Sequence, residues 1–166
     1  MSVAVIALGA NLDDPVTHVH RAARDIANLA DVDITHRSSL YRTSPIGGPE
    51  QPDYVNAIVV VSTTREPTAL LADLHSIEAR HGRTRDVRWG PRTLDLDLIT
   101  YDDVTRNDPA LELPHPRAHH RAFVLVPWFE ADPGARLTGR GAVQRLLQEL
   151  DSSDCVVLDG PRVGEA

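Results

Sequence analysis

The sequence predicts an α+β fold in which an antiparallel sheet carries its first two helices on one face. Strand-like and helix-like patterns follow one another in the order β-α-β-β-α-β over residues 2–100, which is the order of the split-βαβ or ferredoxin-like fold. The 166 residues, 42% of them apolar, suffice for one domain with a hydrophobic core. We therefore expect a single domain over residues 1–166, with a core over about 2–130 and a C-terminal extension over about 131–158.

The first strand is predicted at residues 2–8, a short apolar run. Gly9-Ala10-Asn11 should turn the chain; Gly9 fits a tight turn between strand and helix, and it would also let a ligand approach closely. Asp14-Pro15 is typical of a helix start, an N-cap residue followed by proline at the first helical position. Apolar residues at helical spacing then predict a helix of about four turns.

Two further strands are expected at residues 33–43 and 54–64, joined by a Pro- and Gly-rich loop over 44–53 that is long for a simple hairpin. Tyr54 and Asn56 share one strand face and could offer a ring and an amide to a planar polar ligand, or form an ordinary sheet pair. A second helix begins at Glu66-Pro67 and ends at Gly82. Taken alone, His75 and Glu78 form a solvated flank of that helix.

The most informative stretch is residues 88–100. Thr93, Asp95, Asp97 and Ile99 alternate with leucines, so both carboxylates lie on one face of a half-buried strand, with Cβ atoms about 6–7 Å apart. Two such acids suit a hard cation such as Mg²⁺. Arginines crowd the residues just upstream, at positions 80, 83, 85, 88 and 92. Taken separately, the acid pair fits a solvated sheet edge and the arginine run fits a solvent-exposed loop. Taken together, they predict a polyphosphate site.

Beyond residue 100 the pattern is shorter and more polar. Residues 111–113 can return as a strand, and His115 and Arg121 suit contacts with phosphate; the histidines of this segment lack zinc-ligand spacing. We expect a short helix over 122–130 interrupted at Pro127, a final helix over 143–150, a small strand over 155–158 and a frayed tail over 159–166.

Composition excludes several classes of function. A net charge of −7 argues against general nucleic-acid binding. The single cysteine cannot form an internal disulfide, which fits a reducing compartment. Since no apolar run approaches the ~20 residues of a membrane span and no secretion signal opens the chain, we expect a cytoplasmic protein with no membrane partner.

Several blocks, in order, match one enzyme family. They are Ala7–Leu12, Ser39–Thr43, Gln51–Asn56, Ile77–Arg80, Gly82–Arg85, Arg88–Ile99, Pro114–Pro116 and Arg121–Phe123. The block Trp-Gly-Pro-Arg-x-Leu-Asp-Leu-Asp-Leu, starting at Trp89, is highly specific. The chain resembles the 6-hydroxymethyl-7,8-dihydropterin pyrophosphokinases of folate biosynthesis from Val5 to about Pro127.

The resemblance implies transfer of pyrophosphate from ATP to the hydroxymethyl group of the pterin, with release of AMP and with two Mg²⁺ ions as cofactors. It also implies loops after Gly9, Thr43 and Gly82 that close over the site. We expect a monomer. The implied site residues are Arg83, Arg92 and Asp97 for catalysis; Asp95 and Asp97 for the metals; Glu78, Arg83, Arg85, Arg92, Leu98, His115 and Arg121 for ATP; and Thr43, Tyr54, Asn56, Trp89, Asp95 and Phe123 for the pterin.

The chain departs from the family at three positions: His75 stands where many relatives have Gln, Ser44 where some have Pro, and Pro116 where some have Tyr. Two other functions remain compatible with the residues alone. One is a metal-dependent phospho- or nucleotidyltransferase with another acceptor. The other is a non-catalytic ligand-binding module of the same fold. Residues after about Asp132 carry no motif, so we expect a structural role for them.

Overall fold

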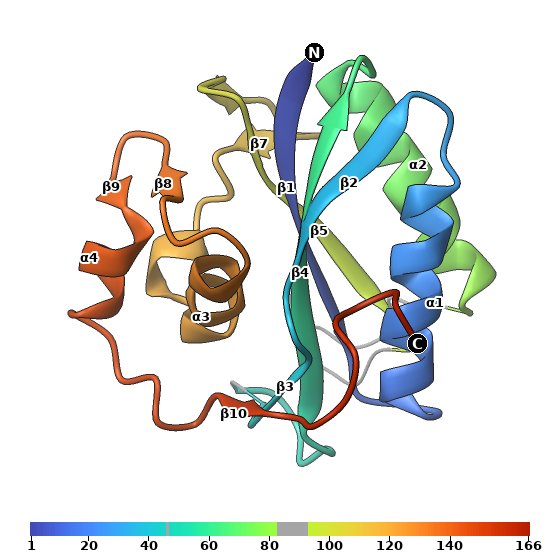
Figure 1. Cartoon of the computed structure of the whole chain (residues 1–166), viewed down its shortest axis with the longest axis vertical. Coiled ribbons are helices and arrows are strands. Elements are labelled where there is room, and N and C mark those ends of the chain that lie inside the picture. Colours follow the sequence, from blue (N-terminus) through green and yellow to red (C-terminus); the bar gives the residue numbers. More distant parts are fainter. Residues whose placement is uncertain (46, 83–92) are drawn as a thin grey trace.

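The computed structural model describes residues 1–45, 47–82 and 93–166, and there it confirms the predicted α+β architecture (Figure 1). One antiparallel sheet has the strand order β10-β3-β4-β1-β5, and β2 also pairs with β4. Its strands are β1 (Ser2–Ala10), β2 (Val32–Arg37), β3 (Tyr41–Thr43), β4 (Tyr54–Thr63), β5 (Asp95–Tyr101) and β10 (Val156–Val157).

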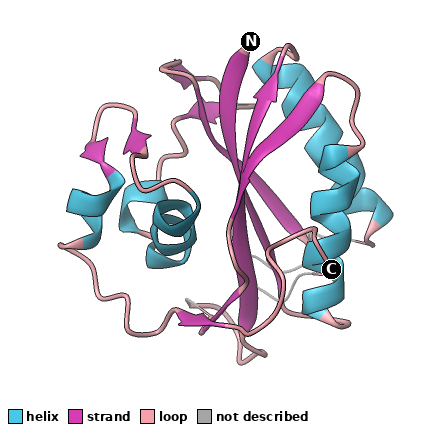
Figure 2. Ribbon diagram, in the orientation of Figure 1, coloured by secondary structure: helices cyan, strands magenta, loops and turns pink. Residues whose placement is uncertain are grey.

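The helices are α1 (Pro15–Ala27), α2 (Pro67–Arg80), α3 (Ala122–Ala131) and α4 (Val143–Leu147), with a 3-10 turn at Ala118–His120. Two small hairpins pair β6 (Arg106–Asn107) with β7 (Glu112–Leu113) and β8 (Arg136–Leu137) with β9 (Gly141–Ala142). Figure 2 shows that helices lie on both sides of the sheet. None of the helices in the described ranges combines the length and the apolar character that a bilayer crossing requires.

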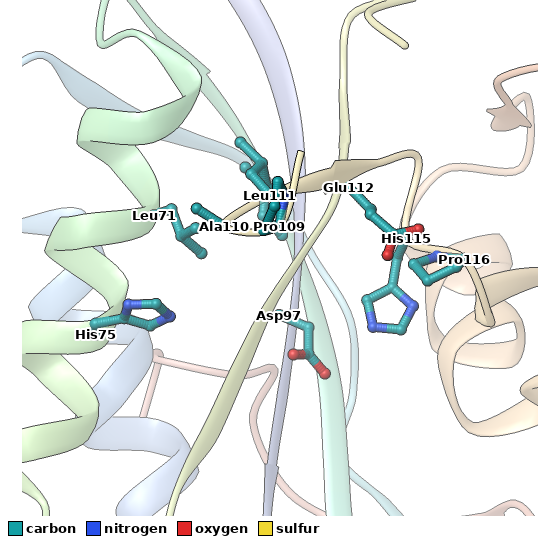
Figure 3. A pocket seen from close by; sticks show the side chains of 10 residues that line it. Leu71, His75, Asp97, Pro109, Ala110, Leu111, Glu112, His115 and Pro116 are labelled. Atoms are coloured by element: carbon teal, nitrogen blue, oxygen red, sulfur yellow. The ribbon is translucent and has the colours of Figure 1, made fainter. Parts of the chain in front are cut away.

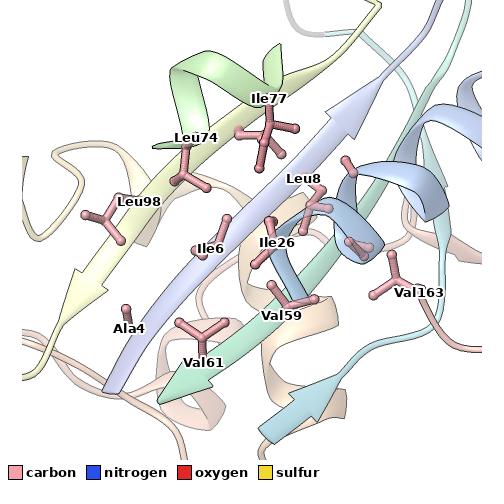
Figure 4. Packing of buried hydrophobic residues seen from close by; sticks show 14 of the residues in the cluster. Ala4, Ile6, Leu8, Ile26, Val59, Val61, Leu74, Ile77, Leu98 and Val163 are labelled. Atoms are coloured by element: carbon pink, nitrogen blue, oxygen red, sulfur yellow. The ribbon is translucent and has the colours of Figure 1, made fainter. Parts of the chain in front are cut away.

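Alternation along the strands divides the core between the two faces of the sheet. Ala4, Ile6 and Leu8 of β1 point toward α1 and α2, where they meet Ile26, Leu74 and Ile77 in the larger apolar cluster (Figure 4). Burying one such side chain contributes about 1.5–3 kcal/mol. The prediction of both early helices on one face is therefore correct.

The opposite face is covered by α3 and α4. Val124, Leu125 and Trp128 of α3 pack on Ile58 and Val60 of β4. Residues 55–61 of β4 are all buried, so this strand is apolar on both faces. A strand of that kind needs cover on both sides, and the C-terminal part of the chain provides the second cover.

Both predicted helix starts are confirmed. The Asp14 side chain accepts a hydrogen bond from Thr17 N at 3.4 Å, and Pro15 is the first residue of α1. Helix α2 starts at Pro67, and Gly82, just beyond its end, has a φ of 74°, a left-handed value that glycine adopts without strain.

Two predictions about strands were wrong. Strand β1 runs through Gly9 to Ala10, so Gly9 is paired within the sheet and does not form the turn. The strand expected at 33–43 is two strands, β2 and β3. In the break between them, Ser39 donates its backbone N–H and its hydroxyl to the Glu130 carboxylate, at 2.7 and 2.6 Å.

The predicted helices after residue 120 also differ. Helix α3 continues through Pro127 to Ala131 without interruption. Proline removes one helical hydrogen bond, and burial of the apolar face of α3 against the sheet offsets that cost. Helix α4 ends at Leu147, three residues before the predicted end at 150, whereas the strand at 111–113 is confirmed as β7.

The prediction of a frayed tail over residues 159–166 was wrong. The small strand at 155–158 is confirmed as β10, which pairs with β3, but the residues after it are also bound to the domain. Val163 is fully buried, and its N–H donates to Ser38 O at 2.9 Å. Gly164 N donates to His20 Nδ1 at 3.0 Å, which ties the tail to α1.

Candidate active site

Three adjacent strands bring the predicted polar residues onto one face of the sheet. Gly9 of β1 is paired with Asn56 of β4 on one side and with Asp95 of β5 on the other. Directly paired residues point to the same face, so Asn56 and Asp95 stand two strands apart, about 10 Å, with only a glycine between them. Asp97 lies on the same face, opposite Ala7. The space above Gly9 is therefore flanked by an amide and by two acids.

The acid pair is under electrostatic strain. Burial, followed by the neighbouring charge of Asp95 and a hydrogen bond between the two side chains, raises the pKa of Asp97 from 3.8 to about 8. At neutral pH the pair therefore retains a proton. Within the described ranges no third His, Cys, Asp or Glu joins them in a metal-binding group, so a cation bound here would complete its shell with water or with substrate oxygens.

His115 and Arg121 face this pair from the segment between β7 and α3. Burial, followed by the positive charge of Arg121, lowers the pKa of His115 to about 4, so its ring is neutral at physiological pH. Its Nδ1 accepts from Arg117 N at 3.2 Å, which leaves Nε2 as the N–H donor. Burial also lowers the pKa of the Arg121 guanidinium, although the negative charge of Asp97 acts in the opposite direction. The guanidinium carbon of Arg121 lies 5.4 Å from the centre of the Phe123 ring.

A pocket of about 200 Å³ adjoins the acid pair. It lies between the flank of α2 and the segment that carries His115, and Figure 3 shows Asp97 and His115 directed into the space between them. The lining residues are Leu71, His75, Asp97, Leu98, Pro109, Ala110, Leu111, Glu112, His115 and Pro116. The pocket therefore joins an apolar recess to a charged end.

Glu78 is not on a solvated flank, which corrects the expectation for this residue. Its side chain is 2% exposed, and Oε2 accepts from Leu96 N at 2.8 Å. Helix α2 is thereby tied to the edge strand β5 beside the acid pair. His75 on the same helix is exposed, as expected, and lines the pocket.

Asn56, which lies across Gly9 from Asp95, is held in one orientation. Its Nδ2 donates to Thr43 Oγ1 at 2.6 Å, and both side chains are buried. A Cβ on Gly9 would lie 2.8 Å from Asn56 Oδ1, so the glycine is required by the amide that lies above it. Tyr54 lies on the same face and is paired with Thr43.

Asn11 is a structural residue of this region that we did not predict as such. It is buried, and its Nδ2 donates to Gln51 Oε1 and to Pro52 O, both at 2.9 Å. These bonds attach the end of the 44–53 loop to the end of β1. The signal in the sequence that could have indicated this role is the position of Asn11, directly after an apolar strand.

The structure thus gathers most of the predicted site residues into one region. The acid pair, His115, Arg121 and Phe123 meet at one end, and Thr43, Tyr54 and Asn56 at the other. Leu98 lines the pocket and Glu78 lies behind β5. The predictions for Arg83, Arg85, Trp89 and Arg92 fall outside the described residues.

Comparisons with known proteins point to one family. Residues 5–133 match the family described as 7,8-dihydro-6-hydroxymethylpterin-pyrophosphokinase (HPPK). The 2-amino-4-hydroxy-6-hydroxymethyldihydropteridine pyrophosphokinase of Haemophilus influenzae is 38% identical over 159 residues, covering 96% of this chain and 99% of that one. The protein of the same description from Bacillus subtilis is 40% identical over 129 residues, covering 78% of this chain and 77% of that one.

Solved structures are similar in fold. Wild-type HPPK-DHPS of Plasmodium falciparum with pterin and p-hydroxybenzoate superposes with a TM-score of 0.68, covering 89% of this chain. This chain spans 41% of that longer protein, at 14% sequence identity. At that identity the likeness concerns the fold alone.

Proposed function

The chain belongs to the 7,8-dihydro-6-hydroxymethylpterin-pyrophosphokinase family, and from this premise we propose how its residues carry out the reaction. It is a pyrophosphokinase of folate biosynthesis that uses ATP and transfers a diphosphate to the hydroxymethyl group of 6-hydroxymethyl-7,8-dihydropterin. Our proposal adds the release of AMP, two Mg²⁺ ions and the role of each side chain. The register of Asn56, Gly9 and Asp95 is the observation that carries it.

Asp95 and Asp97 fit a magnesium site. Their oxygens are the ligands that this cation prefers, and the proton retained by the pair marks a place where positive charge is needed. One or two carboxylates suffice, because Mg²⁺ commonly takes its other ligands from phosphate oxygens and water. When bound, the ions neutralise the phosphate charge that opposes attack by the pterin hydroxyl.

The pocket beside Asp97 is the proposed nucleoside site. Leu71 and Leu98 supply apolar walls for a base, while His75 and Glu112 supply polar groups at the rim. A nucleotide seated there would have its phosphates beside the acid pair. His115 would donate from Nε2, and Arg121 would bind phosphate oxygens through its planar guanidinium.

Arg83, Arg85 and Arg92 complete the proposed phosphate contacts, with Arg83 and Arg92 stabilising the charge of the transition state. Loss of one such donor typically costs about 2.7–4 kcal/mol of barrier, or roughly 10²–10³ in rate. The reaction needs in-line positioning and charge neutralisation more than covalent chemistry. Glu78 supports the site through the backbone of β5.

The pterin would occupy the space above Gly9. The Asn56 amide offers one donor and one acceptor side by side, which complements the amino-pyrimidinone edge of a pterin. Tyr54, Trp89 and Phe123 are proposed to contact or cover the ring, and Thr43 orients the amide. The interval of about 10 Å from Asn56 to Asp95 suits a bicyclic ring with its hydroxymethyl arm directed to the acids.

The deciding experiment follows ATP by phosphorus NMR, with and without the pterin and with and without Mg²⁺. We expect AMP and a pterin diphosphate only when both are present. Formation of ADP and a pterin monophosphate would contradict pyrophosphoryl transfer. Asp103→Asn, a change at an exposed turn, serves as the control for Asp97→Asn and should retain full activity. A cytoplasmic location and a monomeric state stay predictions.

A further inference from the structure

The C-terminal segment, residues 151–166, lies along strand β3, which ends at the proposed pterin site. Its strand β10 pairs Val156 with Arg42 and Val157 with Tyr41 of β3. Beyond the strand, Leu158 N donates to Leu40 O at 2.8 Å, and Val163 N donates to Ser38 O at 2.9 Å. Figure 1 shows this segment passing from the edge of the sheet back to α1. Residues 38–42 are therefore held at successive points by a segment more than 110 positions away in sequence.

One further contact is made at the end of β3. The backbone N–H of Ser44 donates to Asp154 Oδ2 and the Ser44 hydroxyl donates to Oδ1, both at 2.8 Å. A single carboxylate thus binds both donors of one residue, which fixes the direction of the chain as it leaves the strand. Both residues are exposed, so each bond is weak by itself; two donors on one charged acceptor make the pair effective.

Fixing Ser44 also fixes the position of Thr43, its neighbour in the chain. Strand β3 has only three residues, and Thr43 is the last of them. Its Oγ1 holds the Asn56 amide at 2.6 Å, while the close approach of Gly9 permits no other side chain beneath that amide. A shift of a few tenths of an ångström at Thr43 would lengthen this bond and turn the amide.

We propose that Asp154 is a positioning residue for pterin recognition, acting through Ser44 and Thr43 on the Asn56 amide. The inference rests on the proposed function, in which this amide binds the pterin. It assigns to the C-terminal segment a role in substrate affinity beyond the structural role expected from its lack of motifs. Removing the Asp154 carboxylate leaves the segment attached through β10, Leu158 and Val163, so the effect is local to the end of β3.

The test compares Asp154→Ala with Asp159→Ala, which removes the same charge at an exposed position of the same segment. We expect Asp154→Ala to raise the KM and the Kd for the pterin about 5- to 10-fold, as loss of two hydrogen bonds predicts, with kcat and the KM for ATP changed by less than about twofold. Asp154→Asn, which keeps one acceptor oxygen, should recover part of the affinity. Asp159→Ala should behave as wild type.

A double-mutant cycle with Ser44→Ala identifies the route. If Asp154 acts through Ser44, the two changes together weaken pterin binding by less than the product of their separate effects. Independent effects of the two changes would overturn the proposal. So would an equal loss in kcat and in both KM values, or an Asp154→Ala variant no weaker than Asp159→Ala.

Hydrogen exchange separates this proposal from the proposed function. The amides of residues 41–44 should exchange faster in Asp154→Ala than in wild type or in Asp159→Ala, whether or not the protein is assayed for activity. Unchanged exchange there would refute the proposal that Asp154 fixes the end of β3 through Ser44. Absence of pterin turnover in the wild-type protein would instead refute the proposed function, while the exchange result would stand.

Discussion

Replacing Asp97 by asparagine should make the metal-free protein more stable while it greatly lowers magnesium-dependent turnover. The reason is the raised pKa of Asp97, about 8 in the folded protein against 3.8 ordinarily. Between these two values the folded protein binds a proton that the unfolded chain has lost. The free energy of unfolding therefore falls as pH rises from about 4 to 8. Asparagine keeps the shape of the side chain and removes this titration.

The magnitude is set by the size of the shift. One pKa unit corresponds to 1.36 kcal/mol, so the interval from 3.8 to pH 7 sets an upper bound of about 4 kcal/mol. Burial is the main cause of the shift, but the Asp97 side chain keeps some contact with solvent, so we expect Asp97→Asn to stabilise the folded protein by about 2 kcal/mol at pH 7, below this bound. The difference from wild type should shrink toward zero near pH 4.

Urea unfolding followed by tryptophan fluorescence, without Mg²⁺ and at unit intervals from pH 4 to 8, measures this difference. The same preparations are assayed for AMP formation with Mg²⁺, where the variant should lose at least about 10²-fold in kcat. Asp103→Asn controls for the loss of a surface carboxylate. A stability difference that does not change with pH, or near-wild-type turnover in Asp97→Asn, would show that our interpretation of the acid pair is wrong.

Three other changes test separate parts of the site. Gly9→Ala places a Cβ 2.8 Å from Asn56 Oδ1 and should raise the pterin KM about tenfold, measured by initial rates; an unchanged KM would mean that the amide has room to move. Arg92→Ala should lower kcat about 10²–10³-fold with a smaller effect on pterin binding, whereas a pure KM effect would mean that Arg92 binds substrate and transition state equally. Val163→Asp should lower the unfolding free energy by about 3 kcal/mol in urea, because it buries a charge, while Val157→Asp, at a position 53% exposed, should cost little; equal effects would indicate a frayed tail.

The parts of the fold that could be predicted are those encoded by neighbouring residues. Asp14-Pro15 started a helix where expected because capping depends on a few adjacent groups. Pro127 was misread because the local cost of proline is offset by burial against β4, which the neighbouring residues do not reveal. The break between β2 and β3 was missed because Ser39 N, which lies in it, donates to Glu130, 91 positions later in the chain.

The candidate site divides in the same way. The alternation around Asp95 and Asp97 predicted that both acids lie on one face, and the strand register confirms it. Their metal-binding role, which the family motifs imply, stays a prediction. Gly9 was assigned to a turn, since nothing near it in the chain indicates that Asn56 would lie above it. The helical pattern alone assigned Glu78 to a solvated flank, since its partner, Leu96 N, belongs to another element.

Sequence by itself determined the order of the elements, the acids on β5 and the class of reaction, because each depends on short-range periodicity or on a contiguous motif. The tertiary structure alone decided that Asn56, Gly9 and Asp95 stand in one row and that Asp154 reaches Ser44. Strand register and tail docking join residues as far as 144 positions apart through burial and backbone hydrogen bonds. Those interactions exist only once the sheet has formed, and they bring together the residues that we propose for binding the metal and the pterin.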